Sequence, residues 1–324
     1  MSNLHLVDVH KDEVVSEPIR KGFGKGLLEA GKRNVNVVAA CADLTESTQM
    51  GLFRDDYPDR FVEIGVAEQN LVTVASGLAA MAKIPFVSSY AAFSPGRNWE
   101  QIRTTICLND RPVKIVGSHA GISVGPDGAT HQMLEDIALM RVLPNMVVIV
   151  PGDALEAQKA TLAMAEDSRP SYLRLAREAT PIITTDKTPF EIGKAYVYSP
   201  GSDVTVIATG TMTYQALLAA EMLFKTGIDV EVIHCPTIKP LDAVTILKSV
   251  EKTKTVITVE EGQIIGGLGG AVAELLSEEL PTKLKRIGVR DRFGESGTPE
   301  ELLHHFGLTA KHIAMAIHDA YDNK

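Results

Sequence analysis

The chain has 324 residues, of which 45% are apolar and 23% charged, which is the balance of a soluble globular protein and excludes a disordered or collagen-like one. The net charge of −9, without a Lys/Arg cluster, argues against nucleic-acid binding, and no apolar stretch is long enough for a membrane span. The first residues, MSNLHLVDVHKDE, lack the apolar segment of a signal peptide, and the three cysteines are widely spaced. We therefore expect a cytoplasmic protein with reduced thiols, and the length suggests two domains.

The first half of the chain alternates short apolar runs with helical patterns. The apolar runs predict strands at Val35–Ala40, Pro85–Ser89, Val113–Gly117, Val147–Val150 and Tyr172–Leu175. The helical patterns lie at Pro18–Lys32, Ala67–Ala82, Asn98–Asn109, Gln132–Arg141 and Asp153–Ala165. Continuous apolar strands separated by helices are typical of a parallel sheet that is covered on both faces.

The alternation pauses at Glu178–Glu191, which is rich in Thr and Pro, and then resumes. Beyond this segment the patterns predict strands at Val204–Ala208, Val230–Ile233, Val256–Val259 and Leu284–Val289. They predict helices at Thr213–Lys225, Leu241–Val250, Gly267–Glu279 and Thr309–Tyr321. The predicted fold class is therefore α/β, with two tandem doubly wound domains at residues 1–185 and 193–324, mostly parallel sheets, and a linker at 186–192.

Two glycine clusters are candidates for a phosphate-binding loop. Gly22–Gly26 lies inside a predicted helix with no strand before it, which does not match the strand–turn–helix context of a dinucleotide loop. Gly266–Gly270 does follow a strand and open a helix, so phosphate could bind there. Because Gly262 breaks the usual compact spacing, we favour a tight strand-to-helix crossover.

Glu68 opens a predicted helix directly after a strand, in the segment RFVEIGVAEQNLVTVASGLA. One explanation is a carboxylate that stabilises the helix start through exposed amides and the helix dipole. Its neighbours are small and apolar, however, so the carboxylate is expected to be partly buried and to need a partner. Position alone leaves both explanations open.

Aromatic and polar residues follow two predicted strands at their carboxyl ends, where α/β sheets bind ligands. Tyr90 and Phe93 either pack in the core or face a ligand. His119, Asp127 and His131 lie in a Gly-rich loop. Their spacings do not match a metal site, and they better suit hydrogen bonding to a polyhydroxylated substrate and proton transfer.

In combination, several motifs resemble the carboxyl-terminal half of transketolase. They are GVAEQN with Glu68, the Tyr90/Phe93 pair, GISVGPDGATHQMLEDIALMRVLPN and the later RLARE. The resemblance covers nearly the whole chain, with a pyrimidine-binding domain of the thiamine-diphosphate-binding fold to about Thr185 and then the family's carboxyl-terminal domain. Related enzymes share part of the pattern, notably deoxyxylulose-phosphate synthase and the beta subunit of 2-oxoacid dehydrogenases.

The sequence departs from single-chain transketolases in one respect. Their amino-terminal domain carries a GDG motif followed by Asn, which holds Mg²⁺ and the cofactor's diphosphate. This sequence has no GDG, since Gly152-Asp153 is followed by Ala154. The resemblance therefore implies the carboxyl-terminal subunit of a split transketolase, whose amino-terminal partner subunit holds Mg²⁺ (or Ca²⁺) in a heterotetramer.

The resemblance implies which residues bind thiamine diphosphate. Glu68 would hydrogen-bond to N1′ of the aminopyrimidine and so promote loss of the thiazolium proton, most effectively in an apolar, water-poor pocket. Tyr90 and Phe93 would supply an aromatic wall against the pyrimidine. Asp43 and Leu44 resemble the family's Asp-Leu step near the cofactor.

The resemblance also implies the reaction, in which a two-carbon glycolaldehyde unit passes from a ketose phosphate to an aldose phosphate, as in the pentose phosphate pathway. His119, Asp127 and His131 would hold hydroxyls, and the two histidines would relay protons. The residues at the positions of the family's phosphate contacts are Arg20, Ser47 and Arg177. Guanidinium plus hydroxyl suits phosphate, although either arginine alone could be a solvated helix-face charge.

Other readings compete with this one. A 2-oxoacid dehydrogenase beta subunit also pairs with a chain that carries the diphosphate motif, and deoxyxylulose-phosphate synthase is a further enzyme alternative. A non-catalytic interaction subunit would keep the fold but lose the chemistry, which the intact Glu68 argues against. A nucleotide-binding module would rest on Gly266–Gly270. The carboxyl-terminal domain itself presents no catalytic constellation, and we expect it to be structural or dimer-forming.

Overall fold

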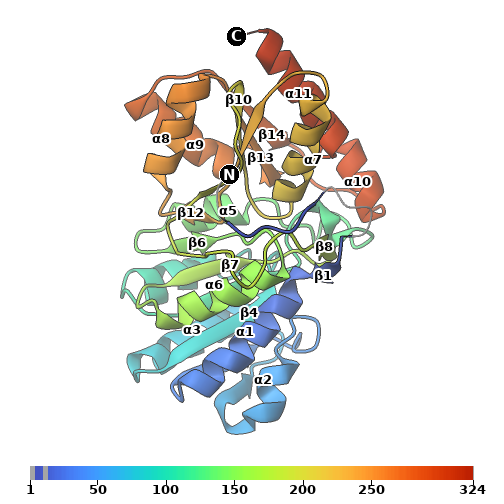
Figure 1. The fold of residues 1–324 in the computed structure, drawn as a ribbon. Helices are drawn as coiled ribbons and strands as arrows, with labels where there is room; N and C mark the ends of the chain where they lie inside the picture. Colours follow the sequence, from blue (N-terminus) through green and yellow to red (C-terminus); the bar gives the residue numbers. More distant parts are fainter. Residues whose placement is uncertain (1–3, 10–13, 324) are drawn as a thin grey trace.

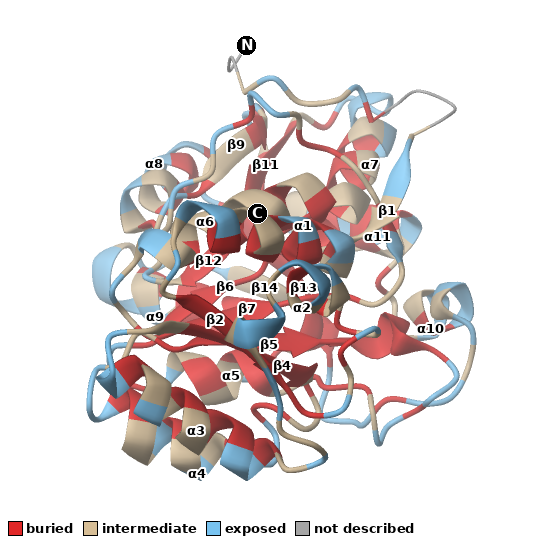
Figure 2. Ribbon diagram, turned by 90° about the horizontal axis from the view of Figure 1, so that it is seen from below, coloured by how far each residue is buried: buried red, intermediate tan, exposed pale blue. Residues whose placement is uncertain are grey.

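The structure, a computed structural model, describes residues 4–9 and 14–323. Its largest sheet has seven strands in the order β12-β6-β7-β5-β4-β2-β3. The strands are β2 (Val37–Cys41), β3 (Phe61–Glu63), β4 (Ile84–Tyr90), β5 (Lys114–Ser118), β6 (Val147–Ile149), β7 (Ser171–Arg174) and β12 (Thr237–Lys239). All neighbours pair in parallel except β12, which is antiparallel to β6. Strands β2, β5, β6 and β7 are buried at every residue, because helices cover both faces of the sheet (Figure 2).

Helices α1 (Ile19–Arg33) and α6 (Ala154–Glu166) lie side by side on one face of this sheet (Figure 2). The other face carries α3 (Glu68–Ala80), α4 (Trp99–Gln101) and α5 (Asp136–Arg141). Glycine allows the close approach of α1 to α6, since a Cβ atom at Gly22 would lie only 1.8 Å from the carbonyl oxygen of Ala154. The cluster Gly22–Gly26 lies within α1 and allows close packing, which agrees with the expectation that it is not a dinucleotide loop.

A second sheet of five strands has the order β14-β13-β10-β11-β9. Its strands are β9 (Tyr196–Ser199), β10 (Val204–Ala208), β11 (Val230–His234), β13 (Val256–Gln263) and β14 (Leu284–Val289). Only β9 runs antiparallel to its neighbour. Helices α8 (Ala243–Thr253) and α9 (Leu268–Glu279) cover one face, and α7 (Met212–Phe224) and α11 (Ala310–Asp322) the other (Figure 1). The predicted class, two tandem α/β units with mostly parallel sheets, is confirmed.

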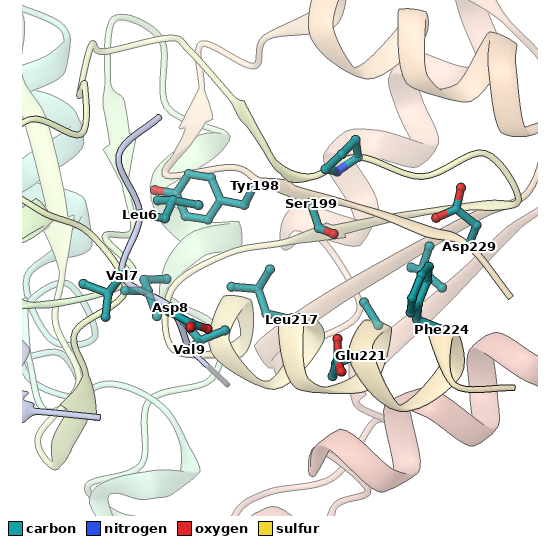
Figure 3. A pocket seen from close by; sticks show the side chains of 14 residues that line it. Leu6, Val7, Asp8, Val9, Tyr198, Ser199, Leu217, Glu221, Phe224 and Asp229 are labelled. Atoms are coloured by element: carbon teal, nitrogen blue, oxygen red, sulfur yellow. The ribbon is translucent and has the colours of Figure 1, made fainter. Parts of the chain in front are cut away.

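The two units share more than a linker. Strand β12 comes after β11 in the sequence, yet it pairs with β6 of the first sheet. At the other end of the chain, Val7 donates its backbone amide to Ile183 of the same unit at 3.0 Å and also reaches the second unit. Figure 3 shows Val7 and Val9 in a pocket with Leu217 of α7 and Tyr198 of β9. Strand β12 of the second unit thus contacts the first unit, and residues near the start of the chain contact the second. The domain limits at residues 185 and 193 stay predictions.

Several short elements were not predicted from the sequence patterns. They are β1 (Ser16–Pro18), β8 (Ala179–Pro181), α2 (Gly51–Asp56), the 3₁₀ turns η1 (Pro58–Arg60) and η3 (Ile122–Val124), α10 (Pro299–His305), and the strands β9 and β12. The expected helix at Asn98–Asn109 continues from α4 as a π-helical segment, η2 (Ile102–Cys107). The helix expected from Gln132 begins only at Asp136. Across 4–9 and 14–323, no helix combines the length and apolarity that crossing a membrane requires.

The second glycine cluster, Gly266–Gly270, opens α9, and a carboxylate of the same chain accepts hydrogen bonds from the backbone amides there. The N–H groups of Leu268 and Gly269 donate to the two carboxylate oxygens of Glu260, both at 2.8 Å. Burial raises the pKa of Glu260 to about 7. This arrangement fits a strand-to-helix crossover and removes the free amides on which a nucleotide-binding module at Gly266–Gly270 would depend.

Candidate functional site

Five adjacent strands of the first sheet, β7, β5, β4, β2 and β3, run parallel and so end at the same edge. A predicted site residue stands at or just beyond each carboxyl end. In strand order these residues are Arg177, His119, Tyr90, Asp43 and Glu68. The topology therefore gathers residues far apart in the sequence at the edge where parallel α/β sheets bind ligands.

Four aromatic and imidazole rings form a cluster at this edge. The rings of Tyr90 and His119 stack with centroids 3.8 Å apart, and the ring of Phe93 stacks with that of Tyr90 at a centroid distance of 6.0 Å. His131 meets Phe93 edge to face at 5.5 Å and Tyr90 at 6.3 Å. Tyr90 and Phe93 thus lie among candidate site residues and not in the interior of the sheet packing.

His119 is held in a neutral state. Its side chain is only 2% exposed, and its Nδ1 lies 2.9 Å from the Ser118 hydroxyl. Burial, followed by the charges of Arg20 and Arg177 and by His131, lowers the pKa of His119 to about 3. At neutral pH this imidazole is therefore uncharged and can accept a proton or a hydrogen bond.

Arg20 and Arg177 form a cationic side of the site. Arg20 donates to the carbonyl of Ser47 at 2.6 Å, and its buried Nε has no hydrogen-bond partner among residues 4–9 and 14–323. Burial is the first cause and Arg177 the second of a lowered pKa at Arg20. Arg177 donates to the carbonyl of Val124 at 2.7 Å and lies 3.9 Å from the Asp127 carboxylate. Two guanidinium groups close to one another make this position suitable for an anion.

Asp127 and His131 lie on the outer side of the same loop. Asp127 is exposed, and its carboxylate faces Arg177. His131 is half-buried, with its Nδ1 2.9 Å from the hydroxyl of Thr130. A carboxylate and an imidazole in these positions can hydrogen-bond to hydroxyl groups of a ligand that reaches the ring cluster.

Glu68 is the first residue of α3 and is 5% exposed. It lies in an open surface hollow that it shares with Val66, Arg97 and other residues of the α3 start. Asn98 fixes its backbone, because the Asn98 amide donates to the Glu68 carbonyl at 2.9 Å and to the Ser94 hydroxyl at 3.1 Å. Over the described part of the chain, no hydrogen bond or ion pair reaches the Glu68 carboxylate. The expected burial is present, and the partner that such a carboxylate needs has to come from elsewhere.

Asp43 and Leu44 follow β2 and are ordered by a neighbouring carboxylate. Glu63 accepts from the amides of Asp43 and Gly65 at 2.7 and 3.0 Å and from the hydroxyl of Thr45 at 2.9 Å. Asp43 is in the left-handed region (φ 59°), and Leu44 packs partly buried against the core below. The loop after β2 is thereby tied to the turn that leads into Glu68.

Sequence reasoning missed three residues that support these positions, namely Glu63, Asn98 and Ser118. Ser118 ends β5 directly before His119, so a search for polar residues at strand ends could have found it. Asn98 and Glu63 act on partners 30 and 20 residues away, and no local pattern signals such contacts.

Together the residues can bind an anion, hold hydroxyl groups and accept protons. In the ranges that the structure describes, no group of three or more His, Cys, Asp or Glu side chains has a metal-binding arrangement.

Comparison with known proteins identifies the class to which this fold and site belong. Residues 17–182 match the family model "Transketolase, pyrimidine binding domain", and residues 193–313 match "Transketolase, C-terminal domain". These are domains of thiamine-diphosphate-dependent enzymes. The chain belongs to the transketolase family, and its recognition as a carboxyl-terminal transketolase chain is confirmed.

Similar proteins have the same extent. A putative transketolase C-terminal section from Methanocaldococcus jannaschii is 47% identical over 94% of this chain and 96% of its own length. A 6-deoxy-6-sulfo-D-fructose transketolase subunit from a Clostridium species is 42% identical over 92% of each chain. Among solved structures, a split-gene transketolase described as an inactive β4 tetramer has a TM-score of 0.88 and 44% identity, covering 94% of this chain and 98% of that one.

Proposed function

We propose that this chain is the carboxyl-terminal subunit of a split, thiamine-diphosphate-dependent transketolase. The complete enzyme moves a two-carbon glycolaldehyde unit from a ketose phosphate to an aldose phosphate, and it is active only with an amino-terminal partner subunit. The observation that carries the proposal is Glu68, a buried carboxylate that receives no hydrogen bond or ion pair from the described residues, at the sheet edge that also carries the neutral His119 and two arginines.

These residues fit the aminopyrimidine end of the cofactor. Glu68 offers a carboxylate shielded from water that can hydrogen-bond to a protonated ring nitrogen, the N1′ atom. Tyr90 and Phe93 offer aromatic surface for the pyrimidine, and Asp43 and Leu44 border it from the loop after β2. Bound thiamine diphosphate would supply the nucleophilic carbon that carries the two-carbon unit between donor and acceptor.

His119 and His131 hold hydroxyl groups of the sugars and move protons during transfer. His119 is neutral at working pH, so it can accept a hydrogen bond from a substrate hydroxyl, and a bound phosphate would offset the arginine charges that, after burial, hold its pKa low. His131, on the opposite side of the ring cluster, is more accessible to a substrate. Asp127 binds a substrate hydroxyl and is oriented by Arg177.

Arg20, Ser47 and Arg177 bind the phosphate end of the substrate. Each arginine already uses one N–H on a backbone carbonyl, which fixes the guanidinium and leaves other donors for an anion. Burial and then the charge of Arg177 lower the pKa of Arg20, and a bound phosphate would offset the second of these effects.

The partner subunit supplies the diphosphate and metal site. We propose that it carries the GDG motif followed by Asn, holds Mg²⁺ (or Ca²⁺), and assembles with this chain as a heterotetramer. The length match to a separate transketolase C-terminal section supports this division of the enzyme, as does similarity to a split-gene transketolase whose β chains alone form an inactive tetramer. Within this chain, residues 1–185 form the pyrimidine-binding domain and 193–324 the carboxyl-terminal domain.

The experiment is a transfer assay with the purified chain, its candidate partner, thiamine diphosphate and Mg²⁺. Fructose 6-phosphate is the donor and an aldose phosphate the acceptor, and the mixture of both chains is expected to transfer while each chain alone does not. Faster transfer from 6-deoxy-6-sulfofructose than from fructose 6-phosphate would show that the site prefers a sulfonate to a phosphate. Oxidative decarboxylation of a 2-oxoacid, or condensation of pyruvate with an aldose phosphate, in place of transfer would instead support one of the two enzyme alternatives.

A further inference from the structure

The loop that carries His119, Asp127 and His131 is held from the second half of the chain. The backbone N–H of Gln263 donates to the carbonyl of Leu134, just after the loop, at 2.9 Å. The side-chain amide of Gln132 donates to the carbonyl of Glu295 at 2.8 Å, as well as to carbonyls inside the loop. The C-terminal domain is therefore in direct contact with a part of the candidate site.

Glu261, on β13, makes the most specific of these contacts. One carboxylate oxygen accepts the amide of Ser123, in η3 of the loop, at 2.7 Å. The other accepts the hydroxyl of Thr211, directly before α7, at 2.8 Å. The side chain is 3% exposed, and Arg174 donates to the Glu261 carbonyl at 2.7 Å. Both carboxylate oxygens are thus committed, one to the loop and one to the C-terminal domain.

The backbone of the loop is shaped to this carboxylate. Gly121 has a φ of +92°, which L side chains rarely adopt, and a Cβ atom there would lie 2.3 Å from the bound Glu261 oxygen. One residue beyond Ser123, the carbonyl of Val124 accepts from Arg177. The carboxylate therefore fixes the stretch that orients Arg177 and leads to Asp127.

We infer that Glu261 is a positioning residue for sugar transfer: it fixes the loop on which His119, Asp127 and His131 depend. The inference rests on the proposed function and gives the C-terminal domain a role in the site. When the Glu261 carboxylate is removed, the Ser123 amide has no acceptor, so the loop samples other conformations. Glu68 lies outside the loop, so its contribution is independent of Glu261.

The first measurement uses the isolated chain and does not depend on the reaction. In Glu261→Ala, hydrogen–deuterium exchange of peptides covering residues 120–133 is expected to be about tenfold faster, whereas peptides of α3 exchange as in the unmodified chain. The matched control is Glu231→Ala, because Glu231 is also 3% exposed but binds Ser249 and Lys252, away from the loop. If Glu261→Ala does not fold, Thr211→Val serves, and about threefold faster exchange in the same peptides is expected. Unchanged exchange in the loop contradicts the inference.

The second measurement uses the chain assembled with its amino-terminal partner. In Glu261→Ala, kcat/KM for sugar transfer is expected to fall roughly tenfold to a hundredfold, while exchange of the cofactor's thiazolium proton stays unchanged. Glu261→Gln keeps an acceptor for the Ser123 amide and is expected to recover most of the activity. Equal losses in transfer and in thiazolium-proton exchange would indicate a general structural defect and overturn the inference. If the unmodified assembly transfers no sugar, the proposed function fails, and the loop-exchange result still decides whether Glu261 holds the loop.

Discussion

Replacing Glu68 with Gln tests the role of the buried carboxylate most sharply. The substitution keeps the size of the side chain and removes its charge. At 5% exposure the carboxylate is shielded from bulk water, so its hydrogen bond to a protonated ring nitrogen would be strong. Loss of one partner in catalytic proton transfer costs on the order of 10²–10⁴ in rate, and we expect an effect in this range.

The alternative, a residue that only stabilises the helix start, gives a very different magnitude. A carboxylate at a helix N-terminus contributes roughly 0.3–1 kcal/mol, so Glu68→Gln would then cost a small part of the stability and leave catalysis intact. The assay is hydrogen–deuterium exchange at the thiazolium carbon, in the complex reconstituted with the amino-terminal partner. Glu46→Gln is the control, since Glu46 is an exposed carboxylate in the loop after β2 that pairs with Arg54. Normal exchange in a folded, cofactor-loaded Glu68→Gln variant would refute the assignment.

Three further outcomes follow from the structure. Arg177→Ala or Arg20→Ala should raise KM for phosphorylated sugars about tenfold to a hundredfold, and unphosphorylated sugars should be affected much less; equal losses in steady-state assays would contradict phosphate binding. Because the pKa of His119 falls to about 3 in the folded chain, the unfolded chain binds one more proton between about pH 3 and 6.5, so this residue makes stability fall as pH decreases through that window. Urea titrations at pH 6.5 and 5 should therefore show a smaller loss for His119→Asn than for the unmodified chain, and identical losses would contradict the shifted pKa. Gly22→Ala should lower the free energy of unfolding by about 1–3 kcal/mol or more, because its Cβ would overlap the Ala154 carbonyl. The control is Gly77→Ala at an exposed position of α3 with open space around it, which should leave the free energy of unfolding equal or raise it by up to about 1 kcal/mol. Equal thermal unfolding of the two variants would contradict the packing argument.

The strands that the sequence predicted well have a strong local signal. The predicted limits of β10 and β14 agree with the structure residue for residue. Strand β10 is buried throughout, and β14 ends in the three buried residues Ile287, Gly288 and Val289. Among the strands that were not predicted, β1 has only three residues, and β12 pairs with a strand about 90 residues earlier. Neither feature leaves a periodic pattern. Local sequence therefore determines the long elements, and tertiary pairing determines the short ones.

The helix predicted from Gln132 shows how tertiary contacts override a local pattern. Its side-chain amide bonds to the carbonyls of Ile122, Gly125 and Glu295, so the backbone around it closes the loop before α5 can begin. The partner at residue 295 lies 163 residues away, beyond the reach of any local signal.

The candidate site was predictable to the extent that it depends on strand ends. Tyr90 and His119 were expected together because parallel strands place their carboxyl ends at one edge, and their rings stack in the structure. Arg177 was expected only from the family resemblance, and the structure places its charge close enough to act on His119. Glu261 could not be found in this way, since its contact with Ser123 spans 138 residues. Long-range contacts of this kind complete the site, and only the fold reveals them.

Calorimetry of cofactor binding tests the central claim that this chain provides half of an active site. The isolated chain is titrated with thiamine diphosphate in the presence of Mg²⁺, and the titration is repeated after mixing with the amino-terminal partner. Tight binding is expected for the mixture and not for the chain alone, because the sequence has no GDG motif and the described residues form no metal-binding group to neutralise the diphosphate. Micromolar binding by the chain alone would contradict the account.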